Sequence, residues 1–198
     1  MNFFTRETLL YRLKNQSDED AWKEFAEIYR PYICKILIRM ELSNADVDDI
    51  NQTVLLKAWE KLPEFDYNKS KGKFRHWLAA ISINAAKNFL RQKNRLSKVL
   101  SGKKKEHIET YLKREKSPEI EKIIQDEWEA FISQQAWDNV QKQMSPTVID
   151  CFRKVMEGMS ISDTAKHIGI SENTVYVYNK RVKNTLCNEI IRLEQELE

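Results

Sequence analysis

The sequence predicts an all-helical protein built from two small domains. Gly and Pro number only four each among 198 residues, so turn signals are too scarce for a many-stranded sheet. Apolar residues recur at intervals of three and four along most of the chain, which is the period of an amphipathic helix. Residues 96–118 break this pattern because they are rich in Lys, Ser and Glu. They predict a basic linker between a domain of residues 1–95 and a domain of residues 119–198.

The first domain is expected to open with helices between residues 6 and 40. Trp22, Phe25 and Tyr29 lie at helical spacing in this stretch. Asp18 and the acids that follow it suit the positive end of a helix. Pro31 is expected to break or bend the run, because proline lacks a backbone N–H.

A further helix is predicted from the segment that begins at Ser43. Ser43 and Asn44 are candidate caps, and Pro63 is expected to end the helix. Its apolar stripe consists of Val47, Ile50, Val54, Leu55, Ala58 and Leu62. Asp46, Asp48, Asp49 and Gln52 lie largely off this stripe, which predicts an acidic exposed face.

The charge pattern changes sign abruptly after this helix. Residues 41–66 contain seven acidic residues and two lysines, whereas residues 71–105 contain eleven Lys or Arg and no acid. The net charge of +3 for the whole chain hides this contrast. A surface without acids suits a polyanion such as nucleic acid, because each carboxylate would repel the phosphates.

The acid-free stretch is itself predicted to be a helix with two faces. Phe74, Leu78, Ile81 and Ala85 form an apolar side. A second, polar side is formed by Asn84, Lys87, Asn88, Arg91 and Arg95. Their cations suit phosphates, and the two amides have donors and acceptors for a base edge.

The spacing of three residues near the C-terminus predicts a helix-turn-helix. Ala165 is small enough for two helices to cross closely, and Gly169 suits the left-handed turn that follows. Val175 is then placed to pack back on the first helix. Ser171 is expected to cap the second helix. A pair of packed helices without any DNA is the alternative reading of this pattern.

The second helix of this motif is expected to have an inner and an outer face. Val175, Tyr178, Val182 and Leu186 are predicted to face inward. The residues predicted to face outward are Glu172, Asn173, Tyr176, Asn179, Lys180 and Lys183. In a DNA-binding protein, such an outward face enters the major groove.

Composition argues against several other classes of protein. Three distant cysteines fit a reducing compartment without a disulfide framework, and no leader or membrane-length apolar run is evident. We therefore expect a soluble, cytoplasmic protein without membrane insertion. The three histidines and the cysteines lack metal-ligand spacing. No nucleophile triad, phosphate loop or paired carboxylates call for catalysis, so neither a cofactor nor an enzyme is expected.

Three segments in this order resemble a bacterial RNA polymerase sigma factor of the compact extracytoplasmic-function (ECF) type. "DVDDINQTVLLKAW" (46–59) is similar to the family's core-binding motif. "GKFRHWLAAISINAAKNFLRQKNR" (72–95) is similar to its promoter-melting and minus-ten-reading segment. "EGMSISDTAKHIGISENTVYVYNKRVKNTL" (157–186) is similar to its region-four helix-turn-helix. The resemblance implies a region two domain in residues 1–95 and a region four domain in residues 119–198.

The resemblance also implies partners and site residues. Core RNA polymerase would be bound through the clamp helices of its largest subunit and the flap of its second largest. Promoter DNA would be bound both as duplex and as single strand, and an anti-sigma factor is a candidate partner. The core-binding candidates are Asp46, Asp48, Asp49 and Gln52. The minus-ten candidates are Lys71, Lys73, Phe74, Arg75, Trp77, Asn84, Lys87, Asn88, Arg91 and Arg95. The minus-thirty-five candidates are Ser171, Glu172, Asn173, Thr174, Tyr176, Asn179, Lys180 and Lys183.

The chain departs from the family pattern in its C-terminal domain, and two other functions stay open. Asp163-Thr164-Ala165 replaces the usual acid-Ile-Ala triplet, and "MSP" replaces the usual Leu-Pro pair. A helix-turn-helix regulator that binds duplex DNA without polymerase is one alternative, and it would normally be a dimer on a palindromic site. A helical adaptor that binds a protein through the acidic helix is the other alternative.

Overall fold

The computed structural model describes residues 6–65, 74–101 and 118–197, and it confirms the all-α prediction. These residues form eight α-helices and one 3₁₀ helix, with no strand among them. The α-helices are α1 (Arg6–Leu13), α2 (Glu19–Arg39), α3 (Asn44–Lys61), α4 (Phe74–Ser101), α6 (Pro118–Gln143), α7 (Pro146–Met156), α8 (Ile161–Ile168) and α9 (Glu172–Leu197). The 3₁₀ helix η1 (Leu62–Glu64) follows α3 at Pro63, where the sequence predicts the end of that helix.

The chain forms two compact units, and the boundary between them falls inside α6. The first unit ends at Phe131, and the second comprises Ile132–Leu197. From the sequence, the boundary was expected within residues 96–118. Residues 96–101 extend α4, and residues 102–117 lie outside the described part of the chain. The apolar period of α6 is the same in both units, so periodicity alone does not reveal where one unit ends.

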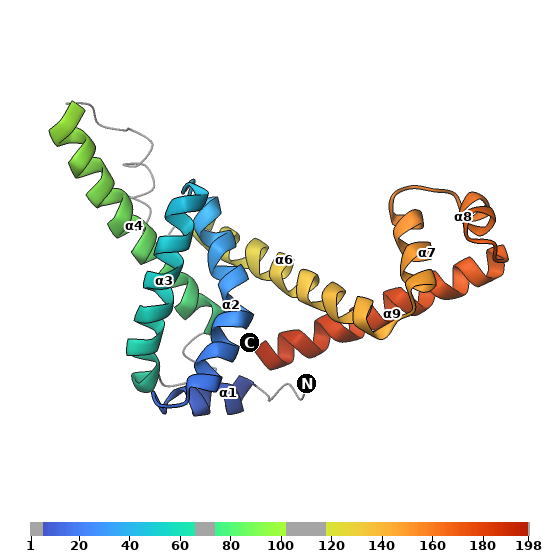
Figure 1. The fold of residues 1–198 in the computed structure, drawn as a ribbon, viewed down its shortest axis with the longest axis horizontal. Coiled ribbons are helices and arrows are strands. Elements are labelled where there is room, and N and C mark those ends of the chain that lie inside the picture. The colour runs from blue at the N-terminus through green and yellow to red at the C-terminus, as the bar shows by residue number, and fades with distance from the viewer. Residues whose placement is uncertain (1–5, 66–73, 102–117, 198) are drawn as a thin grey trace. The chain divides into compact units, whose positions relative to one another are not determined.

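The first unit is built around α2, α3 and α4, which pack against one another (Figure 1). Its core contains Phe25, Tyr29 and Phe74, whose side chains are fully buried and in ring contact. Helix α2 is continuous through Pro31, so of the two predicted outcomes, a break or a bend, the break does not occur. Pro31 is exposed, and the buried Tyr29 and Tyr32 on either side hold the helix against the core. Tertiary packing here outweighs the cost of one missing helical hydrogen bond.

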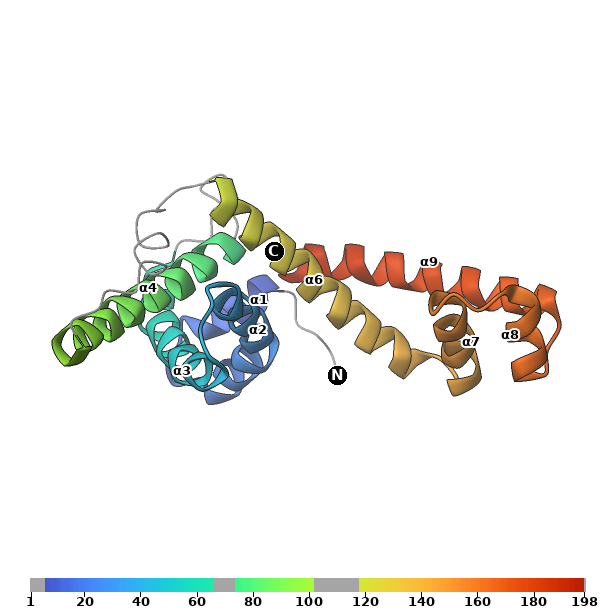
Figure 2. The same cartoon turned by 90° about the horizontal axis from the view of Figure 1, so that it is seen from above.

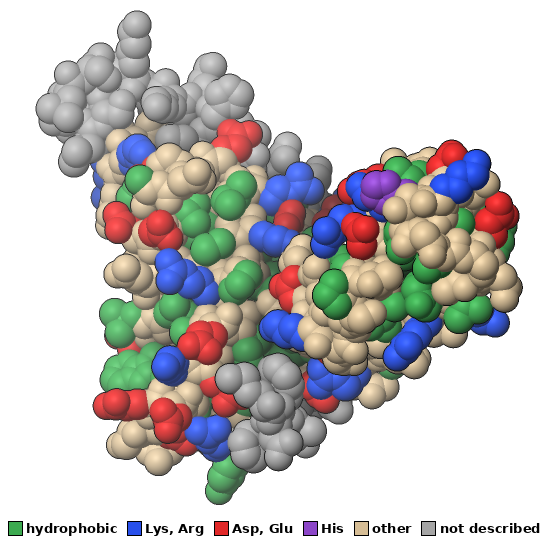
Figure 3. All heavy atoms as spheres, turned by 45° about the vertical axis from the view of Figure 1, so that its right-hand side comes forward, with side chains coloured by type: hydrophobic (Ala, Val, Ile, Leu, Met, Phe, Trp, Pro, Cys, Tyr) green, Lys and Arg blue, Asp and Glu red, His purple; other side chains and the backbone are tan. Residues whose placement is uncertain are grey.

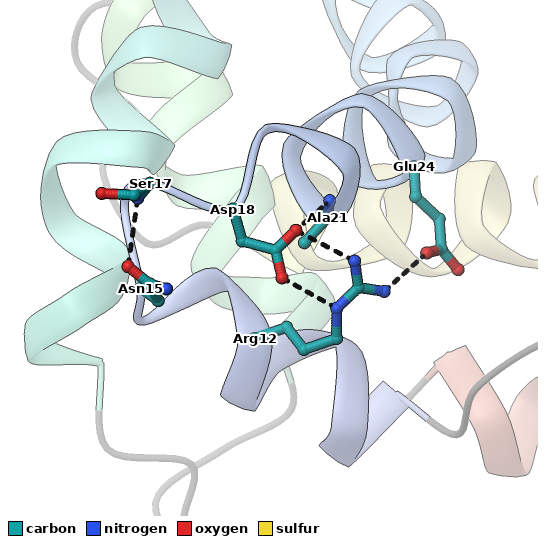
Figure 4. A network of polar contacts seen from close by, with 6 residues as sticks. All are labelled: Arg12, Asn15, Ser17, Asp18, Ala21 and Glu24. Atoms are coloured by element: carbon teal, nitrogen blue, oxygen red, sulfur yellow. Dashed lines mark hydrogen bonds and ion pairs between the residues drawn. The ribbon is translucent and has the colours of Figure 1, made fainter.

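A polar network fixes the turn between α1 and α2 (Figure 4). The Asp18 carboxylate accepts a hydrogen bond from the backbone N–H of Ala21 at 2.9 Å, which caps α2 as the sequence predicts. Arg12 donates to both oxygens of Asp18, at 2.9 and 3.0 Å, and to Glu24 at 3.4 Å. These charge-assisted bonds hold the pKa of Asp18 below its usual value. The network therefore joins α1 to the first turns of α2.

The first half of α6 belongs to the core of the first unit. Trp128 and Phe131 are buried, and their rings contact Tyr32 at centroid distances of 5.2 and 5.8 Å. The Arg75 guanidinium lies 5.7 Å from the Trp128 ring centroid, and it donates to the Gln125 side chain at 2.7 Å. An ion pair between Arg39 and Glu127 and a hydrogen bond between the side chains of His76 and Glu121 flank these contacts. The residues from Pro118 to Phe131 thus complete this core.

In the second unit, α7, α8 and α9 pack against one another (Figure 2). Two adjoining apolar clusters form its core. One contains Val140, Val148, Ile149, Phe152 and Val182 from α6, α7 and α9. The other contains Cys151, Ala165 and Val175 from α7, α8 and α9. The half-buried Tyr178 packs against both clusters and so links them. The inward positions predicted for the second helix of the motif are confirmed, because Val175 and Val182 are fully buried.

None of the helices that the structure describes is long and apolar enough to cross a bilayer. Within those same ranges, His, Cys, Asp and Glu side chains do not gather in threes as metal ligands would.

Candidate functional site: polymerase- and DNA-binding surfaces

The acidic face of α3 begins at its capped N-terminus. Ser43 accepts a hydrogen bond from the backbone N–H of Asp46 at 3.3 Å, which confirms it as the cap. Asp46 in turn accepts hydrogen bonds from the Ser43 hydroxyl and from the Lys93 ammonium, each at 2.7 Å. Both bonds lower the pKa of Asp46, and the bond from Lys93 has the larger effect. Asp46 is therefore engaged inside the first unit.

The other three candidates on α3 are exposed. Asp48 pairs with Arg30 of α2 at 3.1 Å, in an ion pair open to solvent. Asp49 and Gln52 are exposed too, and Leu56 follows one turn after Gln52 with 56% of its surface accessible. Residues 49, 52 and 56 share one side of the helix. We call Asp49, Gln52 and Leu56 the docking face of α3.

Leu56 was not among the residues selected from the sequence. Its signal was nevertheless present, because Leu56 lies off the apolar stripe that Val54 and Ala58 continue. A large apolar side chain exposed beside polar ones is a frequent feature of protein interfaces.

Helix α4 exposes four of the polar residues predicted for it. Asn84, Asn88, Arg91 and Arg95 are all exposed, as helical spacing requires of residues on one side. Arg91 donates to the Asn88 side-chain oxygen at 3.2 Å. The apolar side is buried as predicted, with Phe74 and Leu78 inaccessible. We call the four exposed residues the amide–arginine face of α4.

The remaining minus-ten candidates are placed differently. Phe74 is 0% exposed and Lys87 is 3% exposed, so neither side chain reaches the surface. Arg75 is buried beneath Trp128 and Gln125 of α6. Trp77 is half-buried, with ring contacts to Phe65 and Phe74 at 4.7 and 5.2 Å. The prediction that Lys87 shares the exposed face of Asn84 and Asn88 is therefore wrong. Phe74 lies on the buried apolar side, as its spacing predicts, and Arg75 is buried as well. Lys71 and Lys73 lie outside the described residues.

The helix-turn-helix has the local geometry that the sequence predicts. Gly169 ends α8 in the left-handed region, at φ 76°, which only glycine adopts without a steric penalty. The Ser171 hydroxyl accepts a hydrogen bond from the backbone N–H of Thr174 at 3.1 Å, which caps α9. Ala165 and Val175 meet in one buried cluster. These contacts fix the angle at which α9 leaves the turn.

The outer side of α9 consists of exposed residues from its first three turns. Glu172, Asn173, Tyr176, Lys180 and Lys183 are exposed, and Thr174 is half-buried. Arg181 is also exposed and adds a cation that was not selected from the sequence. On the face shown in Figure 3, Lys and Arg side chains lie among acidic ones over the helices of the second unit.

Asn179 corrects the predicted pattern of this helix. The prediction that it faces outward is wrong, because only 8% of its surface is accessible. Its side-chain nitrogen donates to the carbonyl oxygen of Val175 at 2.9 Å. Its side-chain oxygen is buried without a hydrogen-bond partner among the described residues. Asn179 therefore belongs to the buried side of α9, like Val175 four residues before it.

Comparison with known proteins agrees with this arrangement. Residues 25–96 match the family described as Sigma-70 region 2. The ECF RNA polymerase sigma factor SigW of Bacillus subtilis is 30% identical over 78 residues, which cover 39% of this chain and 40% of that protein. The ECF RNA polymerase sigma-E factor of Haemophilus influenzae is 24% identical over 190 residues, which cover 94% of this chain and 95% of that protein. The first match thus spans less than half of its relative, and the second spans almost all of its relative.

The match to region 2 contains the whole of α3 and the amide–arginine face of α4. The full-length similarity extends over the helix-turn-helix as well. The chain is therefore similar in its first unit to Sigma-70 region 2 and, over almost its whole length, to an ECF RNA polymerase sigma factor.

Proposed function

We propose that this protein binds core RNA polymerase, directs it to promoters with specific minus-thirty-five and minus-ten elements, and helps to open the minus-ten region. The similarity of the chain to ECF RNA polymerase sigma factors supports a role in transcription initiation and not as an enzyme. The observation that carries the proposal is the pairing of two different surfaces on one unit. The docking face of α3 is acidic and apolar, whereas the exposed side of α4 combines two amides with two arginines.

The docking face suits a protein partner. Asp49 has no side-chain partner among the described residues, so its carboxylate is free to meet a cation of another protein. Leu56 supplies apolar area beside it. We assign this face to the clamp helices of the largest polymerase subunit, and we assign the second unit to the flap of the second-largest subunit.

The amide–arginine face suits DNA. Arg91 and Arg95 would contact phosphates, which bind without regard to sequence, and Asn84 and Asn88 would read base edges. In the second unit, α9 would enter the major groove of the upstream element. We therefore propose that the protein acts in the cytoplasm, where promoter DNA and polymerase are found in bacteria.

The test is single-round transcription with purified components. The protein would be added to sigma-free bacterial core polymerase on fragmented genomic DNA of the source organism, and transcript starts would be sequenced. We expect discrete starts that depend on the protein and share two upstream motifs. The absence of such starts together with stable binding to duplex DNA would instead support a regulator that acts without polymerase.

A further inference from the structure

Helix α9 holds a buried carboxylate in its second half. Glu189 is only 8% exposed, and it follows the buried Val182 by seven residues, as Val182 follows Val175. Residues seven apart lie on nearly the same side of a helix, so Glu189 belongs to the inner side of α9. A buried charge is costly unless it is paired, so the partners of Glu189 decide what it does.

Arg192 is the partner of Glu189 within α9. It donates to the two carboxylate oxygens at 2.9 and 2.6 Å, and it also pairs with Glu196. The hydrogen bond from Arg192 is the largest cause that lowers the pKa of Glu189, and a hydrogen bond from Asn139 adds to it. Glu189 therefore stays ionised at neutral pH, against the opposing effect of burial.

Asn139 is the partner of Glu189 on another helix. Its side-chain NH₂ group donates to Glu189 Oε1 at 2.7 Å, which joins the second half of α6 to the second half of α9. Asn179, also buried on the inner side of α9, donates instead to Val175 in its own helix. The apolar packing of α9 is non-directional, whereas a hydrogen bond to a charged group is directional. The bond from Asn139 therefore fixes the rotation of α9 about its own axis.

The rotation of α9 decides which of its side chains meet DNA. Because α9 is one continuous helix, its rotation at Glu189 is also its rotation at the exposed residues of its first three turns. The radius of a helix with its side chains is about 5–6 Å, so a rotation of about 20° moves the side-chain tips by about 2 Å. Such a shift breaks a hydrogen bond to a base edge, because donor and acceptor must lie within about 3.2 Å of each other. A lysine on its flexible stem still reaches a phosphate.

We infer that Asn139 and Glu189 are positioning residues for recognition of the upstream promoter element, because their hydrogen bond sets the face that α9 presents to the base edges. The inference rests on the proposed function, in which α9 enters the major groove of that element. It gives a role in sequence specificity to a pair of residues away from the exposed side of α9.

The test uses the full-length protein and two duplexes. One contains the minus-thirty-five motif that single-round transcription identifies, and the other is a scrambled sequence of the same length. Asn139→Leu removes the bond between the helices without changing the net charge, and it leaves Glu189 paired with Arg192. It should weaken binding of the motif by about tenfold, the order expected for one lost base contact, and leave binding of the scrambled duplex unchanged. Unchanged binding of the motif would overturn the positioning role. Equal weakening on both duplexes would overturn it too, because a variant that is merely less folded loses both.

Gln143→Leu is the matched control, because Gln143 is an exposed amide one turn further along α6. It should bind both duplexes as the wild type does, and a loss of motif binding equal to that of Asn139→Leu would overturn the assignment. Asn139→Asp is a second test variant of the same size, in which a carboxylate faces Glu189. Its added charge affects both duplexes alike, so the ratio of the two affinities should still fall. A wild-type ratio in this variant would contradict the inference.

Nitroxide labels measure the setting of α9 without DNA. Lys142→Cys and Gln195→Cys place the labels at exposed positions of α6 and α9. The two cysteines that are not buried, Cys34 and Cys187, would be changed to Ser. Electron paramagnetic resonance should give one narrow distance distribution for this chain and a broader one when Asn139→Leu is added, and equal widths would overturn the anchor. Broadening in a protein whose wild type prefers neither duplex would overturn the proposed function and leave the anchor between α6 and α9 in place.

Discussion

Asp46 and Lys93 form an ion pair of 2.7 Å that ties the first turn of α3 to the second half of α4. The two residues are 47 positions apart in the chain, and Ser43 completes the arrangement by donating to the same carboxylate. The pair links the helix of the docking face to the helix of the amide–arginine face. Asp46 therefore acts as a structural tie between the two surfaces and is less free to meet polymerase than Asp49.

The first prediction concerns the stability of this tie in acid. The pKa of Asp46 in the folded protein lies below its unfolded value near 3.8. The stabilisation that the Asp46 carboxylate gives the folded state is therefore fully present above that pH. It is lost as the pH falls through the folded pKa. At pH 7, Asp46→Asn should lower the free energy of unfolding by about 0.5–1 kcal/mol, since Lys93 is half exposed. Urea denaturation at pH 7 and below pH 3 measures this, and the difference from wild type should shrink at the lower pH. Asp49→Asn is the control, and a pH-independent difference would contradict the prediction.

The second prediction concerns charge on α3. Reversing Asp48 and Asp49 to Lys should weaken binding to core polymerase by at least about tenfold, because two attractive contacts become repulsive. Duplex binding by the helix-turn-helix unit should be unchanged. Competition against a labelled sigma factor measures the affinity for core polymerase. Equal affinity of the variant would remove the docking face from that role.

The third prediction separates apolar contact from charge. Leu56→Ala should weaken core binding by about five- to tenfold, as expected for an apolar side chain that becomes buried in an interface. It should not lower the free energy of unfolding, because Leu56 is exposed in the free protein. Ile38→Ala is the matched control, since Ile38 is a similarly exposed residue on α2. If both variants bind core alike, Leu56 has no special part in docking.

The fourth prediction concerns the cations of α9. Lys180→Ala should weaken upstream duplex binding on all sequences to a similar extent, because a phosphate contact carries no sequence information. The slope of log affinity against log salt should fall by about 1. Titration of upstream duplex at several salt concentrations measures both effects. A loss confined to one sequence, with an unchanged slope, would point to base recognition by Lys180 instead.

The fifth prediction follows from the buried Asn179. Its side-chain oxygen has no partner among the described residues, and an unsatisfied buried acceptor costs about 1–3 kcal/mol. Asn179→Leu should therefore raise the unfolding free energy of the second unit, by about 1 kcal/mol. Duplex binding should persist, because the side chain faces the core. Thermal unfolding of the full-length protein measures the change, and a lower stability would indicate a partner within the described core.

Local signals in the sequence were enough to predict several helix ends, although not the continuity of α2 through Pro31. Ser43, Gly169 and Ser171 act within three or four residues of themselves, so their roles can be read from the chain. Helical spacing alone did not predict the burial of Asn179. A polar residue at the boundary between the buried and the exposed side of a helix has the same spacing as an exposed residue. Helical spacing also did not predict the Lys93 partner of Asp46, since that contact depends on how two helices cross.

The aromatic residues near the start of α4 show the same limit. Phe74 and Trp77 could have been stacking platforms or core residues by their spacing. Their burial depends on Phe25, Tyr29 and Phe65, which come from other helices and from the turn after η1. The burial of Arg75 depends on Trp128, which is more than fifty residues away in the chain. Such long-range contacts are absent from a periodicity pattern.

The boundary inside α6 limits which segments of this chain could be replaced by the corresponding segments of a relative. The Sigma-70 region 2 match ends at residue 96, yet Trp128 and Phe131 fill the aromatic core of the same unit. In a chimera joined at residue 96, the Tyr29 and Tyr32 rings would pack against an α6 helix taken from another protein. A stable exchange would have to take α2 and the first half of α6 from the same protein, so the exchangeable segment is longer than the matched residues 25–96.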